Sequence, residues 1–480
     1  MSLLRIPIYL LIFAFFFVRS LIDYRLLPDS IGVVIIPDLL ILGILAVASV
    51  RKIGCEPLLR PIGLLLVLTF IGVTILSALW NQRPALSVIL FLRMVLRFYV
   101  MFWALLQFEL SEHELSWYLF VLWVLLLIQI PTAMVKCVIY GQGERAIGTY
   151  DTSGGGNSTA IPMVAAAFLL TYHWTYRRSV GCLLGVLAFT AFGLIGGKRA
   201  VFAMVPLTCL FAAMNAQRFA VGGNRALLRH YLLVGLVSIL VFYVGVRLCP
   251  TLTPEGQIGG SFDLDHLYSY ILQYDTHETQ DGFTTGRFST TVRSLEHITR
   301  DAVTTLLGFG PGYVMKSRVA GAGMERSVDI HGASYGGGDT RLGITYGITG
   351  FSWLLLQVGL LGTLVWLGFF AYLGFVLRRM AGQEQDPFWR SYYLGMVCFS
   401  AVVLFLSITY GSYLISGDLM TFLYYLLLGI GFLHWKSSVA SDVCDEALSE
   451  GLVYGVDPQW SIENLGLRMR EPPTDWVCDR

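Results

Sequence analysis

Two neighbouring cations stand between two apolar runs of the chain. The stretch from Leu194 to Pro206 reads LIGGKRAVFAMVP and places Lys198 and Arg199 at a turn. A guanidinium can grip a phosphate through two parallel hydrogen bonds. Arg199 would also precede the next helix, whose free backbone N–H groups attract anions. The pair therefore predicts a phosphate site, with an interfacial anchor that snorkels to the lipid headgroups as the alternative.

A second arginine stands at the start of a predicted amphipathic helix. In TTGRFSTTVRSLEHI the apolar residues recur at helical spacing after Arg287, at Phe288, Val292, Leu295 and Ile298. Such a helix could lie on a membrane surface. Arg287 falls in its N-terminal turn, which is again a position that binds anions.

One histidine lies in a glycine-rich stretch that could position it for proton transfer. His331 stands in DIHGASYGGGDTRLG, and imidazole can exchange a proton near neutral pH. The alternative is a loop histidine with no catalytic part. The remaining candidates for metal ligands, His266, His277 and His297, are too widely spaced to form a site. We therefore predict an acid or base at His331, and neither a metal nor a cofactor.

Three more arginines are candidate site residues: two lie in an apolar run and one in a glycine-rich connection. Arg93 and Arg97 are four residues apart in an apolar run, hence on one face of a predicted span. Two cations there need an anionic partner or a water-filled cavity. Asp38 or Asp418 could neutralise them, and a lipid phosphate is the alternative partner. Arg145 opens RAIGTY within a glycine-rich connection, which on its own resembles a flexible surface loop.

The composition places all these residues in a membrane protein. The chain has 480 residues, of which 55% are hydrophobic and 14% charged, whereas soluble domains carry nearer a quarter charged residues. No basic cluster has the density of a nucleic-acid-binding surface. The eight cysteines are scattered, without a C-x-x-C pair, so neither a disulfide framework nor a zinc site is predicted.

Apolar runs long enough to cross a bilayer predict about twelve helices. The predicted spans are Ile6–Ile22, Val33–Val50, Pro61–Leu79, Ala85–Gln107, Trp117–Ile139, Thr159–Thr175, Val180–Gly196, Ala200–Asn215, Tyr231–Cys249, Leu342–Leu377, Ser391–Tyr410 and Leu419–Trp435. Short basic loops mark the cytoplasmic side of a membrane. Four such loops share one face if the N-terminus is cytoplasmic, and even parity then places the C-terminus inside as well.

The predicted organisation is an all-α polytopic membrane protein with a large extracytoplasmic loop. Residues 1–249 form the N-terminal transmembrane helices, and residues 250–341 form the outer loop with short amphipathic helices. Residues 342–435 form the C-terminal transmembrane helices. Residues 436–480, with little periodicity, are predicted to be a largely disordered cytoplasmic tail. This arrangement puts Lys198, Arg199 and the outer loop on the same face.

Taken in order, these pieces resemble the O-antigen ligase and O-antigen polymerase superfamily of bacterial inner-membrane glycan transferases, over roughly Gly141 to Leu361. The pieces that carry the resemblance are short and occur in the family's order: RAIGTY (Arg145–Tyr150), GKRA (Gly197–Ala200), Gly286–Arg287, LLGFGPGY (Leu306–Tyr313), His331 and YGITGF (Tyr346–Phe351). The sequence departs from the family at three points. Lys198 replaces a Ser, Ser153–Gly156 replaces a Pro that often precedes Asn157, and Gly332 stands where an Asn commonly follows the histidine.

The resemblance implies a metal-independent glycosyltransferase with a GT-C-like fold in the bacterial cytoplasmic membrane. It would transfer a glycan from polyprenyl (undecaprenyl) diphosphate to a sugar hydroxyl at the outer face, as in lipopolysaccharide O-antigen ligation or exopolysaccharide polymerisation. Arg199, Arg287 and Lys198 would hold the diphosphate, and His331 would be the base. Arg145, Arg93 and Arg97 would be donor or acceptor contacts. The expected partners are the lipid-linked oligosaccharide, a glycan or lipid-sugar acceptor, membrane lipids and envelope polysaccharide assembly proteins.

Two other functions are alternatives to glycan transfer. A secondary transporter for an anionic or sugar substrate would account for Arg93 and Arg97, although no internal repeat is evident in the sequence. A structural or scaffold protein would not need a Lys-Arg pair on the face opposite the other basic loops.

Overall fold

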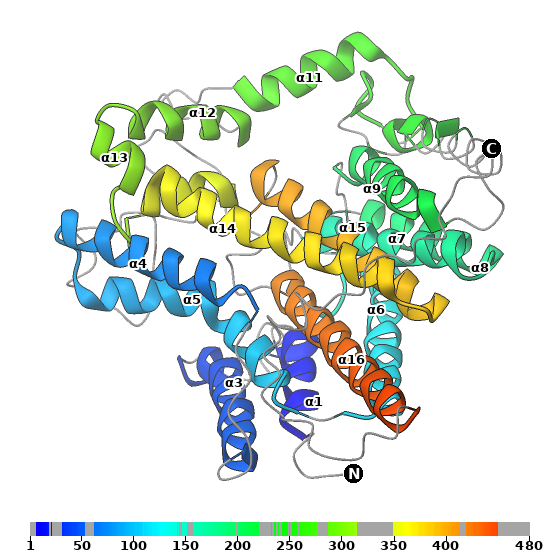
Figure 1. The fold of residues 1–480 in the computed structure, drawn as a ribbon. Helices are drawn as coiled ribbons and strands as arrows, with labels where there is room; N and C mark the ends of the chain where they lie inside the picture. The colour runs from blue at the N-terminus through cyan, green and yellow to red at the C-terminus, as the bar shows by residue number, and fades with distance from the viewer. Residues whose placement is uncertain are drawn as a thin grey trace, which may run out of the picture.

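The computed structural model describes most of the chain between residues 6 and 449 (Figure 1). The described residues are 6–18, 21, 31–52, 62–108, 110–141, 143, 146–150, 157–196, 200–219, 232, 235–236, 239, 242–247, 249, 252–257, 259–276, 287–313, 349–409, 411 and 419–449. Within these ranges the regular structure is entirely helical, which confirms the all-α class.

The helices follow the order of the predicted spans. Their bounds are α1 Ile6–Phe13 with a π-helical continuation η2 Ala14–Val18, α3 Ile31–Lys52, α4 Leu64–Trp80, α5 Ala85–Leu105, α6 Glu112–Tyr140, α7 Asn157–Thr175, α8 Val180–Ile195, α9 Val201–Ala216 with a short 3-10 turn η3 Gln217–Phe219, α11 Leu264–Thr276, α12 Arg287–Ile298, α13 Ala302–Leu307, α14 Gly350–Gln383, α15 Pro387–Thr409 and α16 Leu419–Ser449. Eleven predicted spans overlap α1 with η2, α3 to α9, and α14 to α16. The ninth, Tyr231–Cys249, is described only in part, at 232, 235–236, 239, 242–247 and 249.

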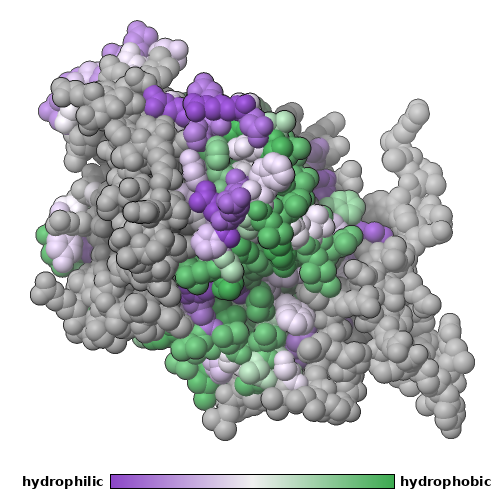
Figure 2. All heavy atoms as spheres, turned by 90° about the vertical axis from the view of Figure 1, so that its left-hand side faces the viewer, coloured by the Kyte–Doolittle hydropathy of each residue, from purple (hydrophilic) through white to green (hydrophobic). Residues whose placement is uncertain are grey.

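Length and surface composition support a membrane protein. Five helices are long and apolar enough to cross a bilayer, over Ala85–Leu105, Glu112–Tyr140, Gly350–Gln383, Pro387–Thr409 and Leu419–Ser438. Apolar side chains also face outward, as at Leu79, which is 72% exposed. Figure 2 shows a broad area of apolar residues on the side that carries α4 and α5. Such a surface is typical of a protein that faces lipid, whereas twelve spans and their orientation remain predictions.

Aromatic side chains fill the interface of α4, α5 and α14. The rings of Phe91 and Trp353 stack with their centroids 5.2 Å apart, and those of Phe70 and Trp366 lie 4.8 Å apart. Large aromatic side chains bury much area and add a specific ring geometry. They therefore hold the start of α14 against α4 and α5.

Segments predicted to share the outer face are in contact at one end of the bundle. The Gly350 N–H at the start of α14 donates to the Gly411 carbonyl after α15, over 2.7 Å. The Gly143 N–H, after α6, donates to the Ile195 carbonyl at the end of α8, over 3.2 Å. The turn between α4 and α5 bonds the chain after α13 through Arg83, whose Nε donates to the Phe309 carbonyl over 2.8 Å. These contacts agree with an alternating path of the spans.

The other end of the bundle collects segments predicted to lie inside. Trp389, at the start of α15, donates its indole N–H to Glu112 at the start of α6, over 3.2 Å. The Arg390 guanidinium lies over the Phe219 ring after α9, 5.4 Å from its centroid. These contacts join segments that the count of spans places on the same side. Which group faces the cytoplasm remains a prediction.

The span predicted over Leu342–Leu377 is not one continuous helix. The helix begins at Gly350, where the Thr349 side chain caps it, and Gly359 interrupts it with φ 65°. The Leu356 carbonyl near this break accepts the Phe309 N–H over 2.8 Å. A Cβ on Gly359 would lie 2.3 Å from the Leu306 carbonyl oxygen. The chain after α13 thus fits against the break and satisfies a backbone group that the helix leaves open.

The end of the last predicted span also differs. α16 continues to Ser449 instead of ending at Trp435, so the first part of the predicted irregular tail is helical. The prediction used apolar composition, which reports burial or lipid contact and does not mark the end of a polar helix. Residues 450–480 lie outside the described residues.

Three helices of the predicted outer loop lie along one side of the bundle. α11, α12 and α13 run across the top of Figure 1, above α14. The predicted helix after Arg287 is confirmed as α12, and it packs against α14. This layer is the part of the outer loop that positions a candidate site.

Candidate functional site

Four of the predicted site residues, Lys198, Arg199, His331 and Arg145, lie outside the described residues. α8 ends at Ile195, three residues before Lys198 in the sequence. Leu194, near that end, packs against a small core that includes Cys249, Leu252 and Leu267 of α11. α11 in turn contacts α12. The segment before Arg199 and the helix that begins at Arg287 therefore lie at the same end of the bundle.

Arg287 is the first residue of α12, as its sequence position predicts. It is partly buried, and its carbonyl accepts the Thr291 hydroxyl over 3.0 Å. The first N–H groups of a helix lack partners within it and attract negative charge. Arg287 thus stands at the end of α12 where the helix itself favours an anion.

Hydroxyl groups hold the first turns of α12 against the start of α14. The Ser352 hydroxyl donates to Thr291 over 2.9 Å. Thr349 caps α14 by accepting the Ser352 N–H over 3.2 Å, and its hydroxyl lies 2.9 Å from that of Ser352. Thr349 and Ser352 are fully buried. This network fixes Arg287 relative to the rigid start of α14, and sequence patterning did not indicate it.

The GFGPGY stretch is a turn, as predicted, and it anchors the far end of the α12–α13 unit. Asn81 donates its side-chain amide to the Gly308 carbonyl over 3.1 Å, and Ser77 donates its hydroxyl to the Leu307 carbonyl over 2.5 Å. The Gly312 N–H donates to the side chain of Gln357 over 2.8 Å. Gly308 is required here, because a Cβ would lie 2.5 Å from the backbone nitrogen of Gly359. The α4–α5 turn and α14 therefore hold this stretch from two sides.

His297, whose spacing from the other histidines argued against a metal site, lies at the end of α12. His297 Nε2 is 3.2 Å from the hydroxyl of Tyr313, and its ring packs on Phe309 with the centroids 4.7 Å apart. Arg83 lies over the Tyr313 ring, 5.4 Å from its centroid. His297 follows Arg287 by ten residues, or about 15 Å along a helix. The two side chains therefore do not act on one atom.

The described part of RAIGTY is packed into the bundle and is not a flexible loop. Ala146, Ile147 and Tyr150 are buried. Two polar side chains of α6 hold the backbone between them. Lys136 donates to the Gly148 carbonyl over 2.6 Å, and Gln129 accepts the Thr149 N–H over 2.6 Å. A Cβ on Gly148 would lie 2.0 Å from Gln129 Oε1, so the side chain that accepts the Thr149 N–H would have to move.

Arg93 and Arg97 both find an anionic partner in Asp38. Arg93 donates Nε to Asp38 over 3.1 Å and pairs with the same carboxylate through Nη2. Arg97 Nη1 lies 3.6 Å from the other carboxylate oxygen, and its guanidinium stacks over Phe98 at 4.6 Å. The first of the two predicted partners is thus in place, whereas Asp418 lies outside the described residues. These contacts support a structural part for the two arginines.

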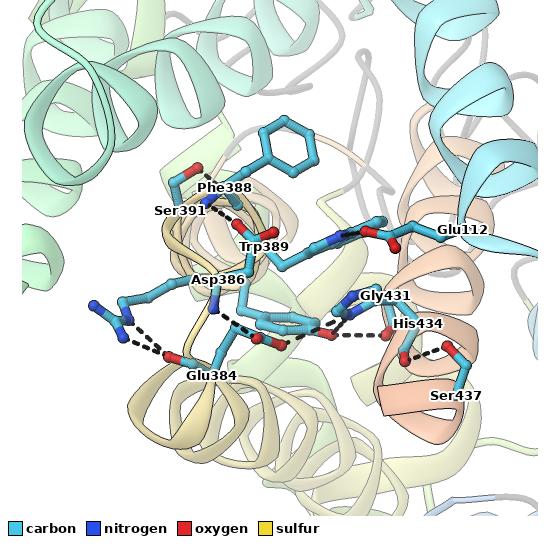
Figure 3. Close-up of polar contacts among 11 residues, drawn as sticks. Glu112, Glu384, Asp386, Phe388, Trp389, Ser391, Gly431, His434 and Ser437 are labelled. Atoms are coloured by element: carbon cyan, nitrogen blue, oxygen red, sulfur yellow. Dashed lines mark hydrogen bonds and ion pairs between the residues drawn. The ribbon is translucent and has the colours of Figure 1, made fainter. Parts of the chain in front are cut away.

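A second polar cluster joins α6, α14, α15 and α16 at the opposite end (Figure 3). The rings of Trp389 and His434 stack with their centroids 3.8 Å apart, and His434 Nδ1 is 2.9 Å from the Tyr393 hydroxyl. Glu384 Oε2 lies 3.7 Å from the same nitrogen. Arg390 donates Nε to the Glu384 carbonyl over 2.9 Å, which closes the turn between α14 and α15.

Burial governs the charge of Glu384 in this cluster. Desolvation raises the pKa of its carboxyl above the ordinary value of 4.5, and the Asp386 N–H opposes that rise by donating to Oε1 over 3.0 Å. Desolvation always favours the neutral form of a carboxyl group. We interpret the cluster as a structural contact that joins four helices, at the end of the bundle opposite Arg287.

Within the described residues no group of three His, Cys, Asp or Glu side chains is arranged to hold a metal ion. Protein-family models and curated proteins were both compared with the chain, and neither comparison finds a match.

Proposed function

We propose that this protein transfers a glycan from a polyprenyl diphosphate to a sugar hydroxyl at the outer face of the cytoplasmic membrane. The observation that carries the proposal is the placement of Arg287. It begins α12, is anchored to α14 by Thr291 and Ser352, and shares one end of the bundle with the segment that leads into Arg199.

The chemistry of the proposed step needs cations and a base. The acceptor hydroxyl oxygen forms a bond to the anomeric carbon while the bond from that carbon to the diphosphate breaks. The hydroxyl proton passes to His331, and the electron pair of the broken bond leaves with the diphosphate. Arg199 and Arg287, with Lys198 in support, stabilise the charge that grows on the leaving oxygens. A histidine base typically contributes about 10²–10⁴-fold to such a rate.

Rigid attachment matters because this stabilisation depends on groups that are already in place. A donor aimed at developing charge avoids reorganisation in the transition state. The hydrogen bond from Ser352 to Thr291 fixes the start of α12 before any substrate binds, and the Thr349 hydroxyl lies 3.5 Å from that of Thr291. Arg287 is thus held by two helices instead of a mobile loop, as such a role requires.

The transporter remains the second candidate, and its main support has weakened. That reading rested on Arg93 and Arg97 in the membrane. Both pair with Asp38, whose single carboxylate balances one of the two positive charges within the protein.

Alanine at either arginine tests the proposal. Arg199→Ala and Arg287→Ala should each lower glycan transfer by about 10²–10³-fold while membrane abundance stays near normal, because one charge-stabilising donor is lost. Lysine should restore little activity, since it lacks the planar fork. Arg379→Ala is the control: this exposed arginine lies near the end of α14 and should keep wild-type transfer. Full activity of an alanine variant would remove that arginine from the mechanism.

A further inference from the structure

α12 buries polar side chains and exposes apolar ones, which is the reverse of an amphipathic helix on the surface of a soluble protein. Its buried residues are Thr290, Ser294 and Ile298, two of which are polar. The larger apolar side chains face outward instead: Phe288 is 72% exposed, and Val292 and Leu295 are each 37% exposed. A helix that only covered an aqueous face of the protein would present the reverse pattern.

Three stripes divide the circumference of this helix. The buried residues follow one another every four positions and face α14. The apolar residues at 288, 292 and 295 form the next stripe, because positions three and four apart share a helical face. Arg293 and Glu296 form the third stripe, and Arg300 follows in the turn directly after the helix; all three are polar and at least partly exposed. The order around the helix is therefore protein, apolar surface and charged surface.

The neighbouring elements also expose apolar side chains. α13 packs against α4, and its Leu306 is 52% exposed. At the end of α4 that faces α13, Leu79 and Trp80 are 72% and 61% exposed. Because α4 is an apolar helix of a membrane protein, α13, the helix that follows α12, packs on an element whose outer surface lipid is expected to cover.

We infer that α12 lies in the membrane interface, with Phe288, Val292 and Leu295 among the acyl chains and Arg293 and Arg300 at phospholipid phosphates. The occupant of the apolar stripe is lipid because the stripe is bordered by protein on one side and by two arginines on the other. A basic amphipathic helix that lies in the interface plane has this distribution. The inference goes beyond the proposed transfer reaction and does not depend on it.

This placement has a consequence for the start of the helix. An interfacial helix lies along the membrane plane, so its first residue stays at the depth of its last. Arg287 would then be held at the level of lipid phosphates, which is where the diphosphate of any lipid-linked substrate would lie.

Collision accessibility of spin labels tests the inference on the full-length chain. Single cysteines at Val292, Leu295 and Arg300, in a background without native cysteines, are labelled in liposomes of phosphatidylethanolamine and phosphatidylglycerol. Leu79 serves as the lipid-facing reference and Glu255, which is exposed in the outer segment, as the aqueous reference. Labels at Val292 and Leu295 should collide with oxygen several-fold more than with a water-soluble nickel chelate, as at Leu79. The label at Arg300 should favour the chelate.

Two results would overturn the placement. Chelate accessibility at Val292 and Leu295 equal to that at Glu255 would put α12 in water. Low accessibility to both reagents would show that protein, such as a second copy of the chain, covers the stripe. If the label at one position prevents folding, the other position and Phe288 carry the same test. Glycan transfer is not measured, so the outcome is separate from that of the proposed function.

Discussion

At the scale of single residues, the structure explains why the RAIGTY stretch contains a glycine. RAIGTY contains a glycine because Gln129 of α6 occupies the space beside Gly148, and Lys136 takes the carbonyl of the same residue. The sequence alone favoured a surface loop there. Gln129 and Lys136 are buried polar side chains in an apolar helix, and this feature could have indicated that α6 holds a backbone segment.

Alanine at Gly148 should therefore destabilise the protein. The added Cβ would meet Gln129 Oε1 at 2.0 Å and Tyr150 at 2.9 Å, and overpacking of this kind typically costs about 1–3 kcal/mol. The melting temperature of the detergent-solubilised protein should fall. Gly72→Ala is the matched control, because nothing lies within 4 Å of a Cβ at that helical position. Equal melting temperatures of the two variants would contradict the packing of this stretch.

The junction around Glu384 should give the protein a specific response to pH. Burial raises the pKa of Glu384 above 4.5, so the folded state favours the protonated carboxyl. The stability that this group contributes is fully present below about pH 4.5, and it is lost as the pH rises through the raised pKa.

Glu384→Gln removes that titration and keeps an oxygen that can accept the Asp386 N–H. The variant should melt above the wild type at neutral pH, and the difference should shrink as the pH approaches 4.5. Melting curves in detergent at a series of pH values measure it. Parallel curves for the two proteins would show that burial does not control this carboxyl group.

At the scale of elements, apolar periodicity located the helices well, because each span must present hydrophobic residues to lipid or to the core. The start of α12 at Arg287 followed from its amphipathic spacing. The break at Gly359 could not be predicted, since it depends on the backbone of Leu306 and Gly308, which are about fifty residues away in the chain. The hydroxyl network of Thr349 and Ser352 was missed for the same reason.

Loosening the attachment of α12 should impair Arg287 without touching it. Ser352→Ala removes the donor to Thr291 and the contact with Thr349. A buried hydrogen-bonding group left without its partner costs about 1–3 kcal/mol. Glycan transfer should fall mainly through kcat, because the arginine is displaced from the developing charge.

The control is Ser294→Ala on α12, a buried serine whose hydroxyl bonds the Thr290 carbonyl of its own helix. It should keep wild-type kinetics. A loss of stability in both variants with unchanged kcat in Ser352→Ala would mean that the hydroxyl network has only a structural part.

At the scale of the whole molecule, several contacts join connections that the count of spans places on the same side, and these contacts form two groups. Arg83 with Phe309 and Gly350 with Gly411 belong to one group, and Trp389 with Glu112 belongs to the other. The alternating path of the spans was read from hydrophobic runs and basic loops. The contacts agree with that path, whereas only the distribution of basic loops assigns one end to the outside.

The position of Lys198 tests that assignment. A cysteine at Lys198, in a chain without native cysteines, should react with a membrane-impermeant thiol reagent on intact spheroplasts, because the end of α8 lies with the outer group. A cysteine at Arg379, on the opposite end, should react only after permeabilisation. The reverse pattern would invert the topology and move the phosphate site to the cytoplasm.

Transfer by the purified protein in liposomes tests the central claim most directly. The assay supplies a polyprenyl-diphosphate-linked oligosaccharide with a labelled sugar acceptor, and measures the new glycosidic bond together with free polyprenyl diphosphate. The wild type should form both products in equal amounts, in the presence of EDTA, and His331→Ala should be about 10²–10⁴-fold slower. The account would be contradicted if the donor stayed intact and no new glycosidic bond formed. Glycan that accumulated unchanged across the membrane would then favour transport.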